Sequence, residues 1–112
     1  MKIADLVAKM NFTVYSGGNG LVREISSGYV SDLLSDVMGN AREGQVWITL
    51  QSHKNIMAVA SLKELAGIIL VKGIKPDQEA IIKSDEEDLP ILGSDEDTFT
   101  VAGKLFEILQ DL

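Results

Sequence analysis

The amino-acid sequence predicts an α/β fold: a mostly parallel sheet of strand-helix units, covered by helices in a three-layer or two-layer sandwich and preceded by a helix and two short strands. Three strand-like segments begin near Val46, Gly67 and Leu89, about 21 residues apart, which is the length of one strand plus one helix. The middle segment, residues 67–71, contains no polar side chain, as is typical of a strand buried on both faces of a parallel sheet.

The N-terminal part predicts one helix and two short strands. Four apolar residues at helical spacing form one face of the helix: Ile3, Leu6, Val7 and Met10. Residues 12–15 and 21–25 have the β-branched and apolar content of strands, and residues 16–20 predict a turn. The two strands are expected either to form an antiparallel hairpin or to lie apart, with the second at a sheet edge. Because a strand-like segment follows the turn, a plain turn is preferred over an anion-binding loop.

The middle of the chain predicts a helix, a strand and a second helix. Ser31 is expected to cap the first helix, which ends at Gly39-Asn40. Its buried stripe is expected to contain Leu33, Leu34, Val37 and Met38. Residues 45–50 predict a strand in which Trp47 takes a half-buried core position. Ser52 is expected to cap the second helix. The apolar face of that helix contains Ile56, Val59, Ala60, Leu62 and Leu65.

Two further helices flank the last predicted strand. Pro76 is expected in the first turn of the earlier helix, where its missing N–H costs nothing. The strand at residues 89–92 contains Pro90, which cannot donate to a ladder, so the strand is expected to start late or lie near an edge. Asp95 or Asp97 is expected to begin the last helix. Its apolar face contains Val101, Ala102, Leu105, Ile108, Leu109 and Leu112.

Length and composition favour one soluble domain over residues 1–112. The chain has no cysteine, which excludes disulfides and thiolate metal sites and fits a reducing compartment, so a cytoplasmic location is expected. The N-terminus has no signal-peptide pattern, and the longest apolar run is far too short to span a membrane. The net charge is -7, with eleven acidic and two basic residues from Asp77 onward. This acidic half would repel phosphate backbones, so nucleic acid is not an expected partner.

The sequence contains no pattern that indicates catalysis. There is no Gly-x-x-x-x-Gly-Lys-Ser/Thr loop, no Gly-x-Gly-x-x-Gly between a strand and a helix, and no His-Glu-x-x-His. His53 is the only histidine, and no nucleophile pattern accompanies it. The acidic runs at 85–88 and 95–97 lack the alternation of a calcium loop. The first is expected to be a solvated loop, and the second is expected to begin a helix. We therefore expect no catalytic residue, no cofactor and no bound metal.

Two polar loops provide the candidate binding site. Residues 51–55 and 72–76 each follow a strand of the predicted parallel sheet, so they should lie side by side at its carboxyl edge, where open α/β domains bind ligands. Three lysines in these loops predict a small anion as ligand. The candidate contacts are Ser52, His53, Lys54, Asn55, Lys72, Gly73 and Lys75. The alternative interpretation is that these are solvated turn residues.

The order of these segments resembles the DRTGG domain family, which is similar in fold to the N-terminal domain of HPr kinase/phosphorylase. The resemblance rests on Gly28-Tyr29-Val30, the helix ending at Met38, the strand 46–50, the loop 51–55 and the segment from Leu62 to Pro76. It covers nearly the whole chain through short motifs. The family implies a regulatory or accessory module, often attached to catalytic or nucleotide-sensing domains.

The family motifs are changed in this chain. In the family an acidic-basic pair follows the first strand, where this chain has His53-Lys54-Asn55, and Thr-Gly-Gly follows the next, where it has Val71-Lys72-Gly73. Only Gly73 is retained. The kinase chemistry of HPr kinase/phosphorylase belongs to a separate domain with a nucleotide loop, so these residues do not support a kinase label.

Three functional hypotheses follow. The leading one is a non-catalytic regulatory or interaction domain, expected as a homodimer by family analogy, that senses a small phosphorylated or nucleotide-like anion. The alternative is a structural adaptor for a larger enzyme, which would respond to a protein partner and to no small molecule. An enzyme that uses His53 with Lys54 or Lys72 is disfavoured, because no nucleophile is recognisable.

Overall fold

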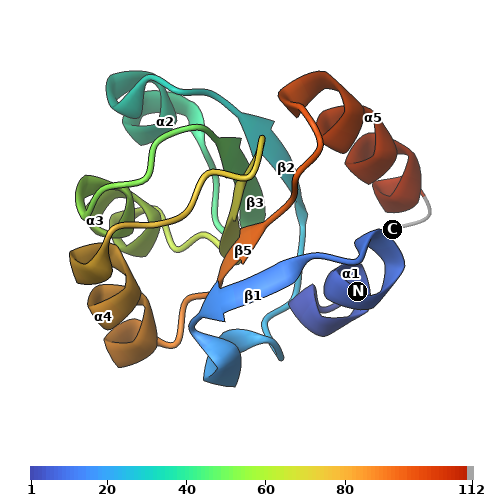
Figure 1. The fold of residues 1–112 in the computed structure, drawn as a ribbon. Coiled ribbons are helices and arrows are strands. Elements are labelled where there is room, and N and C mark those ends of the chain that lie inside the picture. Colours follow the sequence, from blue (N-terminus) through green and yellow to red (C-terminus); the bar gives the residue numbers. More distant parts are fainter. Residues whose placement is uncertain (111–112) are drawn as a thin grey trace.

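The computed structural model describes residues 1–110, which form three layers: a central sheet with helices on both faces (Figure 1). The strands are β1 (Thr13–Ser16), β2 (Ser27–Val30), β3 (Gln45–Thr49), β4 (Gly67–Leu70) and β5 (Ile91–Gly93). The helices are α1 (Ile3–Met10), α2 (Leu34–Asn40), α3 (Asn55–Leu62), α4 (Gln78–Glu87) and α5 (Thr98–Leu109), with a short 3₁₀ helix η1 (Gly18–Gly20). Helices α2, α3 and α4 cover one face of the sheet, and α1 and α5 cover the other.

The strands follow the order β1-β5-β4-β3-β2, with β4 in the centre. Strands β2 to β5 run parallel to one another, and β1 pairs antiparallel with β5. The predicted mostly parallel sheet of strand-helix units is therefore confirmed, in its three-layer form. The continuously apolar segment that begins at Gly67 is the middle strand, and β5 starts after Pro90, as the missing N–H of that proline requires.

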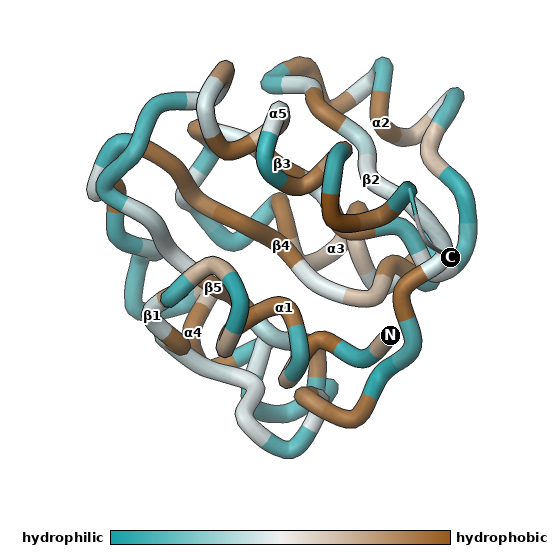
Figure 2. Tube along the Cα trace, turned by 90° about the vertical axis from the view of Figure 1, so that its right-hand side faces the viewer, coloured by the Kyte–Doolittle hydropathy of each residue, from teal (hydrophilic) through white to brown (hydrophobic). Residues whose placement is uncertain are grey.

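Two apolar cores lie on opposite faces of the sheet (Figure 2). Side chains alternate along a strand, so Val46 and Ile48 of β3 face α1 and α5, whereas Trp47 faces α2, α3 and α4. Every residue of β3 and β4 is buried. Trp47 was expected to be half-buried, but its side chain is 0% exposed, and its Nε1–H donates to the Ser31 carbonyl oxygen at 2.8 Å.

The prediction of a second strand at residues 21–25 is wrong. Residues 21–25 form no strand, and the hairpin alternative is also wrong, because β1 pairs with β5 at the other end of the sheet from β2. The backbone at 21–25 instead runs along the start of α1, where Ile3 N–H donates to the Arg23 carbonyl at 3.0 Å. The strand forms at Ser27–Val30, where pairing with β3 outweighs a weak local preference.

Two predicted serine caps are wrong. Ser31 Oγ accepts a hydrogen bond from the N–H of Leu33 in a two-residue turn, and α2 begins only at Leu34. Ser52 lies in the loop before α3, and that helix begins at Asn55 without a side-chain cap. The Ser31 hydroxyl closes a local turn instead of capping the helix, and the backbone carbonyl of Ser52 accepts from the N–H of Asp77 in the neighbouring loop. Three residues predicted in the buried stripes are exposed: Leu33, Met38 and Leu62.

The last two helices begin near the predicted residues. Pro76 is buried and precedes α4 by two positions, so Asp77 rather than Pro76 flanks the first turn. Asp97 is the N-cap of α5, and its carboxylate accepts from the N–H of Thr100 at 2.8 Å, which agrees with one of the two predicted starts. Leu112, expected on the apolar face of this helix, lies outside the described residues.

Candidate functional site

The two lysine-bearing loops are neighbours at the carboxyl edge of the sheet. Strands β3 and β4 pair in parallel, so the chain leaves both of them on the same side. The N–H of Asp77, at the end of the second loop, donates to the carbonyl oxygen of Ser52 in the first at 2.9 Å. The structure therefore brings residues 51–55 and 72–76 together, which is the arrangement that an anion site between them requires.

Lys54 provides a cation at this edge that is already paired. Its Nζ lies 3.1 Å from Oε2 of Glu79, at the start of α4, and both side chains are largely exposed. An exposed ion pair of this kind contributes at most about 1 kcal/mol. The Lys54 ammonium is thus free to exchange this carboxylate for a more highly charged anion at low cost.

The turn at Lys72 and Gly73 is fixed by the next loop. Both residues have left-handed backbone angles, with φ of 59° and 71°. Their N–H groups donate to the carbonyl oxygens of Glu96 and Ser94, at 2.8 and 2.9 Å. Because these amides are already paired, this turn offers an anion its lysine side chains rather than its backbone donors.

Carboxylates surround the same edge and weaken its positive potential. The pKa of Asp97 is lowered by hydrogen bonds from the backbone and hydroxyl of Thr100 and, to a smaller extent, by the charge of Lys72. Lys72 therefore sits close enough to the carboxylate of Asp97 to affect its titration. An anion that approaches Lys72 competes with this carboxylate. Because dissolved salt screens the charge of an exposed lysine, binding of the anion should weaken as the salt concentration rises.

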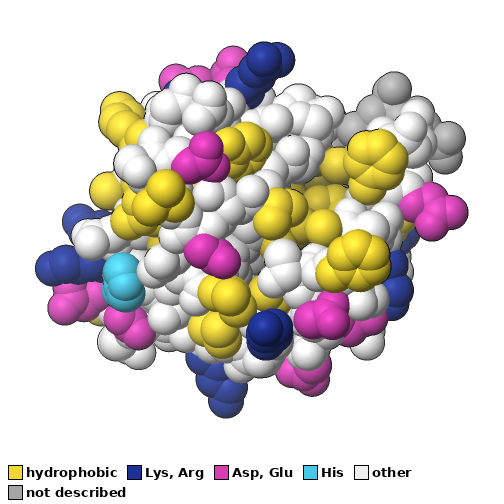
Figure 3. All heavy atoms as spheres, turned by 90° about the horizontal axis from the view of Figure 1, so that it is seen from above, with side chains coloured by type: hydrophobic (Ala, Val, Ile, Leu, Met, Phe, Trp, Pro, Cys, Tyr) yellow, Lys and Arg dark blue, Asp and Glu magenta, His cyan; other side chains and the backbone are white. Residues whose placement is uncertain are grey.

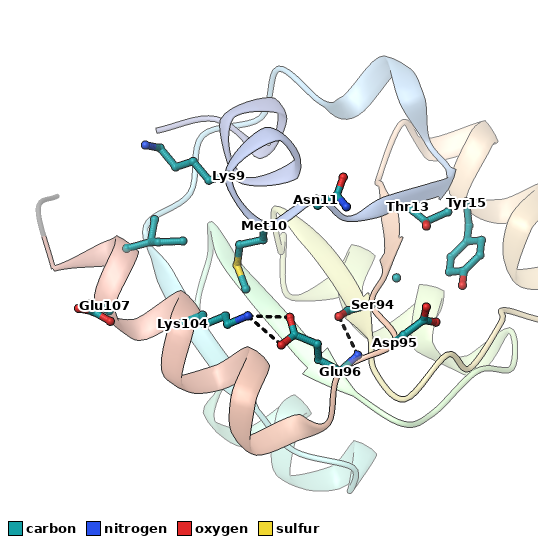
Figure 4. Close-up of a pocket in the computed structure, with 12 residues that line it drawn as sticks. Lys9, Met10, Asn11, Thr13, Tyr15, Ser94, Asp95, Glu96, Lys104 and Glu107 are labelled. Carbon is teal, nitrogen blue, oxygen red and sulfur yellow. Dashed lines mark hydrogen bonds and ion pairs between the residues drawn. The ribbon is translucent and has the colours of Figure 1, made fainter.

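A polar cavity of about 710 Å³ opens beside these loops, between α1 and α5 (Figure 4). Lys104 crosses its floor and donates to both carboxylate oxygens of Glu96, at 3.0 and 2.8 Å. The other labelled side chains are Lys9, Met10, Asn11, Thr13, Tyr15, Ser94, Asp95 and Glu107. Sequence reasoning missed this cavity. Its walls come from α1, β1, the segment 93–96 and α5, and no local pattern joins these distant parts of the sequence.

A second, apolar groove of about 510 Å³ lies between β2 and α5. Phe99 and Phe106 of α5 stand on its rim with 87% and 70% of their surface exposed. Sequence reasoning missed this groove as well. The signal available was the pair of phenylalanines seven residues apart, which place two aromatic rings on one face of the last helix.

The acidic run 85–88 was expected to be a solvated loop, which is wrong, because residues 85–87 are the end of α4 and Asp88 is its C-cap. The glycine-rich turn is occupied by internal contacts. In the turn after β1, the N–H of Gly17 donates to Asp85 at 2.7 Å, so this turn packs against α4. Within residues 1–110, no three His, Cys, Asp or Glu side chains lie where they could hold a metal ion. No helix of this same part of the chain is long and apolar enough to cross a bilayer.

Two aspartates should make folding stability sensitive to acid. The pKa of Asp36 is lowered by hydrogen bonds from Tyr29, whose hydroxyl lies 2.8 Å away, and from Ser31 and Asn40. The pKa of Asp97 is lowered as described above. A lowered folded-state pKa contributes stability that is present above the ordinary aspartate pKa of about 3.9 and is lost as the pH falls through the lowered value.

We therefore expect urea midpoints to fall as the pH drops below about 4. The acid loss should be smaller in Asp36→Asn and Asp97→Asn than in the wild type, because neither amide titrates. Urea unfolding followed by circular dichroism between pH 2.5 and 7 measures this. Parallel curves for all three proteins would contradict the attribution of the acid sensitivity to Asp36 and Asp97.

The fold and its edge define a class: a small α/β domain with a mostly parallel five-stranded sheet and polar loops gathered at the carboxyl ends of its strands. The sequence profile of the DRTGG domain matches residues 5–108. The chain therefore belongs to the DRTGG domain family, and the predicted resemblance is confirmed. A comparison with curated proteins gives no match.

The chain is also similar in fold to a solved structure, described as the crystal structure of the CBS and DRTGG domains of the regulatory region of Clostridium perfringens pyrophosphatase complexed with activator, diadenosine tetraphosphate. The two share 18% sequence identity with a TM-score of 0.74. The match covers 99% of this chain and 47% of that one, so this chain spans about half of that length. A DRTGG domain of the same fold thus lies within a regulatory region, which agrees with the predicted regulatory class.

Proposed function

We propose that this chain is a non-catalytic regulatory domain that senses a small phosphorylated or nucleotide-like anion at the carboxyl edge of its sheet. The observation that carries this proposal is the contact between the two loops, in which Asp77 N–H donates to Ser52 O. That contact joins the loop that contains Lys54 to the loop that contains Lys72 and Lys75, which supports an anion site between them. The proposed site residues are Ser52, His53, Lys54, Asn55, Lys72, Gly73 and Lys75, and among them Gly73 shapes the turn, because its N–H is already paired with Ser94.

The chemistry of the edge limits what the ligand can be. Lys54, Lys72 and Lys75 are exposed and offer point charges, which suit phosphate oxygens. Glu79 and Asp97 stand beside two of these lysines, so a ligand with a single negative charge gains little by displacing them. A ligand with two or more charges, such as a pyrophosphate or nucleotide group, is the class that this edge favours.

The similar pyrophosphatase region supports nucleotides as the first probes. That region contains CBS and DRTGG domains and was crystallised with diadenosine tetraphosphate as activator. We therefore choose pyrophosphate, AMP, ADP, ATP and diadenosine tetraphosphate as the test panel.

The expected result is a rise in thermal stability with at least one multiply charged member of the panel. A ligand at 100 times its dissociation constant adds about 2.7 kcal/mol to the free energy of unfolding. Differential scanning fluorimetry at low salt measures this for the wild type and for the double variant Lys72→Ala, Lys75→Ala. Lys63→Ala, at the opposite end of α3 from Lys54, is the control, which removes one positive charge where the double variant removes two.

The shift should be lost in the double variant and kept in the control. An equal shift in all three proteins would mean that the ligand binds elsewhere. The absence of any shift at millimolar concentrations would contradict the anion proposal itself.

The second candidate function is an interaction domain, which the apolar groove between β2 and α5 favours. Exposed aromatic rings are costly in a chain that acts alone, and they mark surfaces that partners cover. This role includes a homodimer, as the sequence suggested, or an adaptor for a larger enzyme. The two candidates are compatible, since the groove is lined by other residues than the anion site.

We propose that residues 1–112 act as one module, that it works in the cytoplasm, and that its fold is shared with the N-terminal domain of HPr kinase/phosphorylase. The absence of cysteine supports a reducing compartment. The exposed position of His53 supports a non-catalytic role, because a general base needs a positioned partner.

A further inference from the structure

The polar cavity of about 710 Å³ adjoins the loop that contains Lys72 and Lys75, and the segment from Ser94 to Glu96 lies between the two. Ser94 and Glu96 line the cavity, and their carbonyl oxygens accept from the N–H groups of Gly73 and Lys72, at 2.9 and 2.8 Å. A cavity of this size suits a small organic ligand. A ligand held by these lysines therefore needs to cross only this segment to reach the cavity.

Tyr15 lies at the wall of the cavity because β1 is irregular at this residue. Val14 pairs with Leu92, and Ser16 rather than Tyr15 pairs with the preceding residue of β5, so Tyr15 is the extra residue of the strand. Such an irregularity redirects a side chain. The ring of Tyr15 lies over the backbone of Gly93, in space that a side chain at residue 93 would fill. The cavity thus has an aromatic surface in a fixed place.

Asp95 stands at the same end of the cavity as Tyr15, and Lys9 and Glu107 lie at the other end (Figure 4). The Asp95 carboxylate also borders the lysine-bearing loop, because its Oδ1 lies 3.2 Å from the position that a Cβ of Gly73 would take. The carboxylate is exposed, and it accepts hydrogen bonds but cannot donate them. This end of the cavity therefore offers an acceptor and an aromatic ring directly beside the proposed anion site.

The charges of the cavity favour a neutral group with several hydroxyls. Within residues 1–110, two lysines and three carboxylates line it. Figure 3, which looks down on the carboxyl edge of the sheet, likewise shows basic and acidic side chains interspersed. Carboxylates repel a further anion and lysines repel a cation, whereas a hydroxyl group both donates and accepts. A sugar has such hydroxyls and also C–H groups that can pack against an aromatic ring.

We infer that the end of the cavity formed by Tyr15 and Asp95 binds the sugar of a phosphorylated ligand, which is ribose in a nucleotide or in a sugar phosphate. This inference rests on the proposed function, because the lysine-bearing loops hold the phosphate. The sugar hydroxyls donate to the Asp95 carboxylate, and the C–H face of the sugar packs on the Tyr15 ring. A phosphate without a sugar gains nothing from Asp95, since like charges repel.

Isothermal titration calorimetry tests the hydroxyl contact with two pairs of matched probes. One pair is ADP and 2′,3′-dideoxy-ADP, and the other is ribose 5-phosphate and 2-deoxyribose 5-phosphate. The members of a pair carry the same phosphate groups and differ only in their sugar hydroxyls. We expect the wild type to bind the hydroxylated member of at least one pair about 10-fold more tightly, as one hydrogen bond to a charged group provides. A preference within the ADP pair alone identifies a nucleotide, and one within the ribose pair shows that the sugar phosphate is enough.

Asp95→Ala should bind the two members of each pair equally, because the acceptor is gone, and the change in charge affects both members alike. Tyr15→Ala should weaken ADP relative to pyrophosphate, which has no sugar. Glu107→Ala is the matched control, since it removes the same charge at the other end of the cavity and should keep the wild-type preference. Circular dichroism establishes that each variant is folded.

Equal binding of both members of each pair by the wild type would overturn the inference, and so would an Asp95→Ala variant that keeps the preference. Pyrophosphate separates this failure from a failure of the proposed function. If pyrophosphate binds the wild type but not the double variant Lys72→Ala, Lys75→Ala, the anion site stands without a sugar site. If neither pyrophosphate nor any other probe binds, both proposals are wrong.

Discussion

Trp47→Ala is expected to lower the free energy of unfolding by about 3–5 kcal/mol. Trp47 is fully buried in the middle of β3, among side chains of α2 and α3. Its removal leaves a large cavity in a core where neighbouring strands and helices limit collapse. It also leaves the carbonyl oxygen of Ser31 without the indole N–H that holds it at 2.8 Å.

The control for this change is Trp47→Phe, which keeps an aromatic ring but removes the indole N–H. We expect it to lose roughly 1–3 kcal/mol, since one carbonyl loses its partner and the ring is smaller. Urea unfolding followed by circular dichroism at 222 nm measures both variants. A loss below 1 kcal/mol for Trp47→Ala would contradict the packing described for this core.

Gly20→Ala is expected to destabilise the domain by about 1–3 kcal/mol through overpacking. The backbone of Gly20 lies against the chain that enters β5, where an added Cβ would overlap the carbonyl oxygen of Asp88 and the ring of Pro90. The obstacle is backbone, so it cannot rotate away as a flexible side chain would.

Gly18→Ala is the matched control in the same 3₁₀ helix. An added Cβ there meets no atom within 4 Å, so we expect a change within about 0.5 kcal/mol. Thermal and urea unfolding of the two variants compares them directly. Equal stabilities would mean that the turn does not pack against the chain at residues 88–90.

The sequence predicts an element correctly where the pattern of its residues matches the burial and pairing that the element has in the fold. Strand β4 combines an unbroken apolar run with a central position, so its sequence and its burial require the same residues. Strand β2 is the opposite case. Only Tyr29 and Val30 of this strand favour β structure, and its pairing with β3 identifies it, whereas segment 21–25 uses its backbone against α1. A single sequence contains neither of these long-range contacts.

The sequence predicts the meeting of the two loops at the candidate site, but not the cavity or the groove beside it. Parallel pairing of β3 and β4 is enough to bring residues 51–55 and 72–76 to one edge, and the spacing of strands and helices already indicated that pairing. The helices after these strands begin about two residues later than predicted, and the residues before them include the hydrogen bond between the Asp77 N–H and the Ser52 carbonyl, which local sequence does not indicate. The polar cavity and the apolar groove both depend on α5, which returns to the opposite face of the sheet only through tertiary packing.

The most direct test of anion binding at the carboxyl edge is a titration of the ¹⁵N-labelled chain with pyrophosphate and with ADP, followed by amide chemical shifts. We expect saturable shifts at residues 52–55 and 72–75, and their loss in the double variant Lys72→Ala, Lys75→Ala. Shifts confined to other parts of the chain, or none at 10 mM ligand, would contradict the claim that this edge senses an anion.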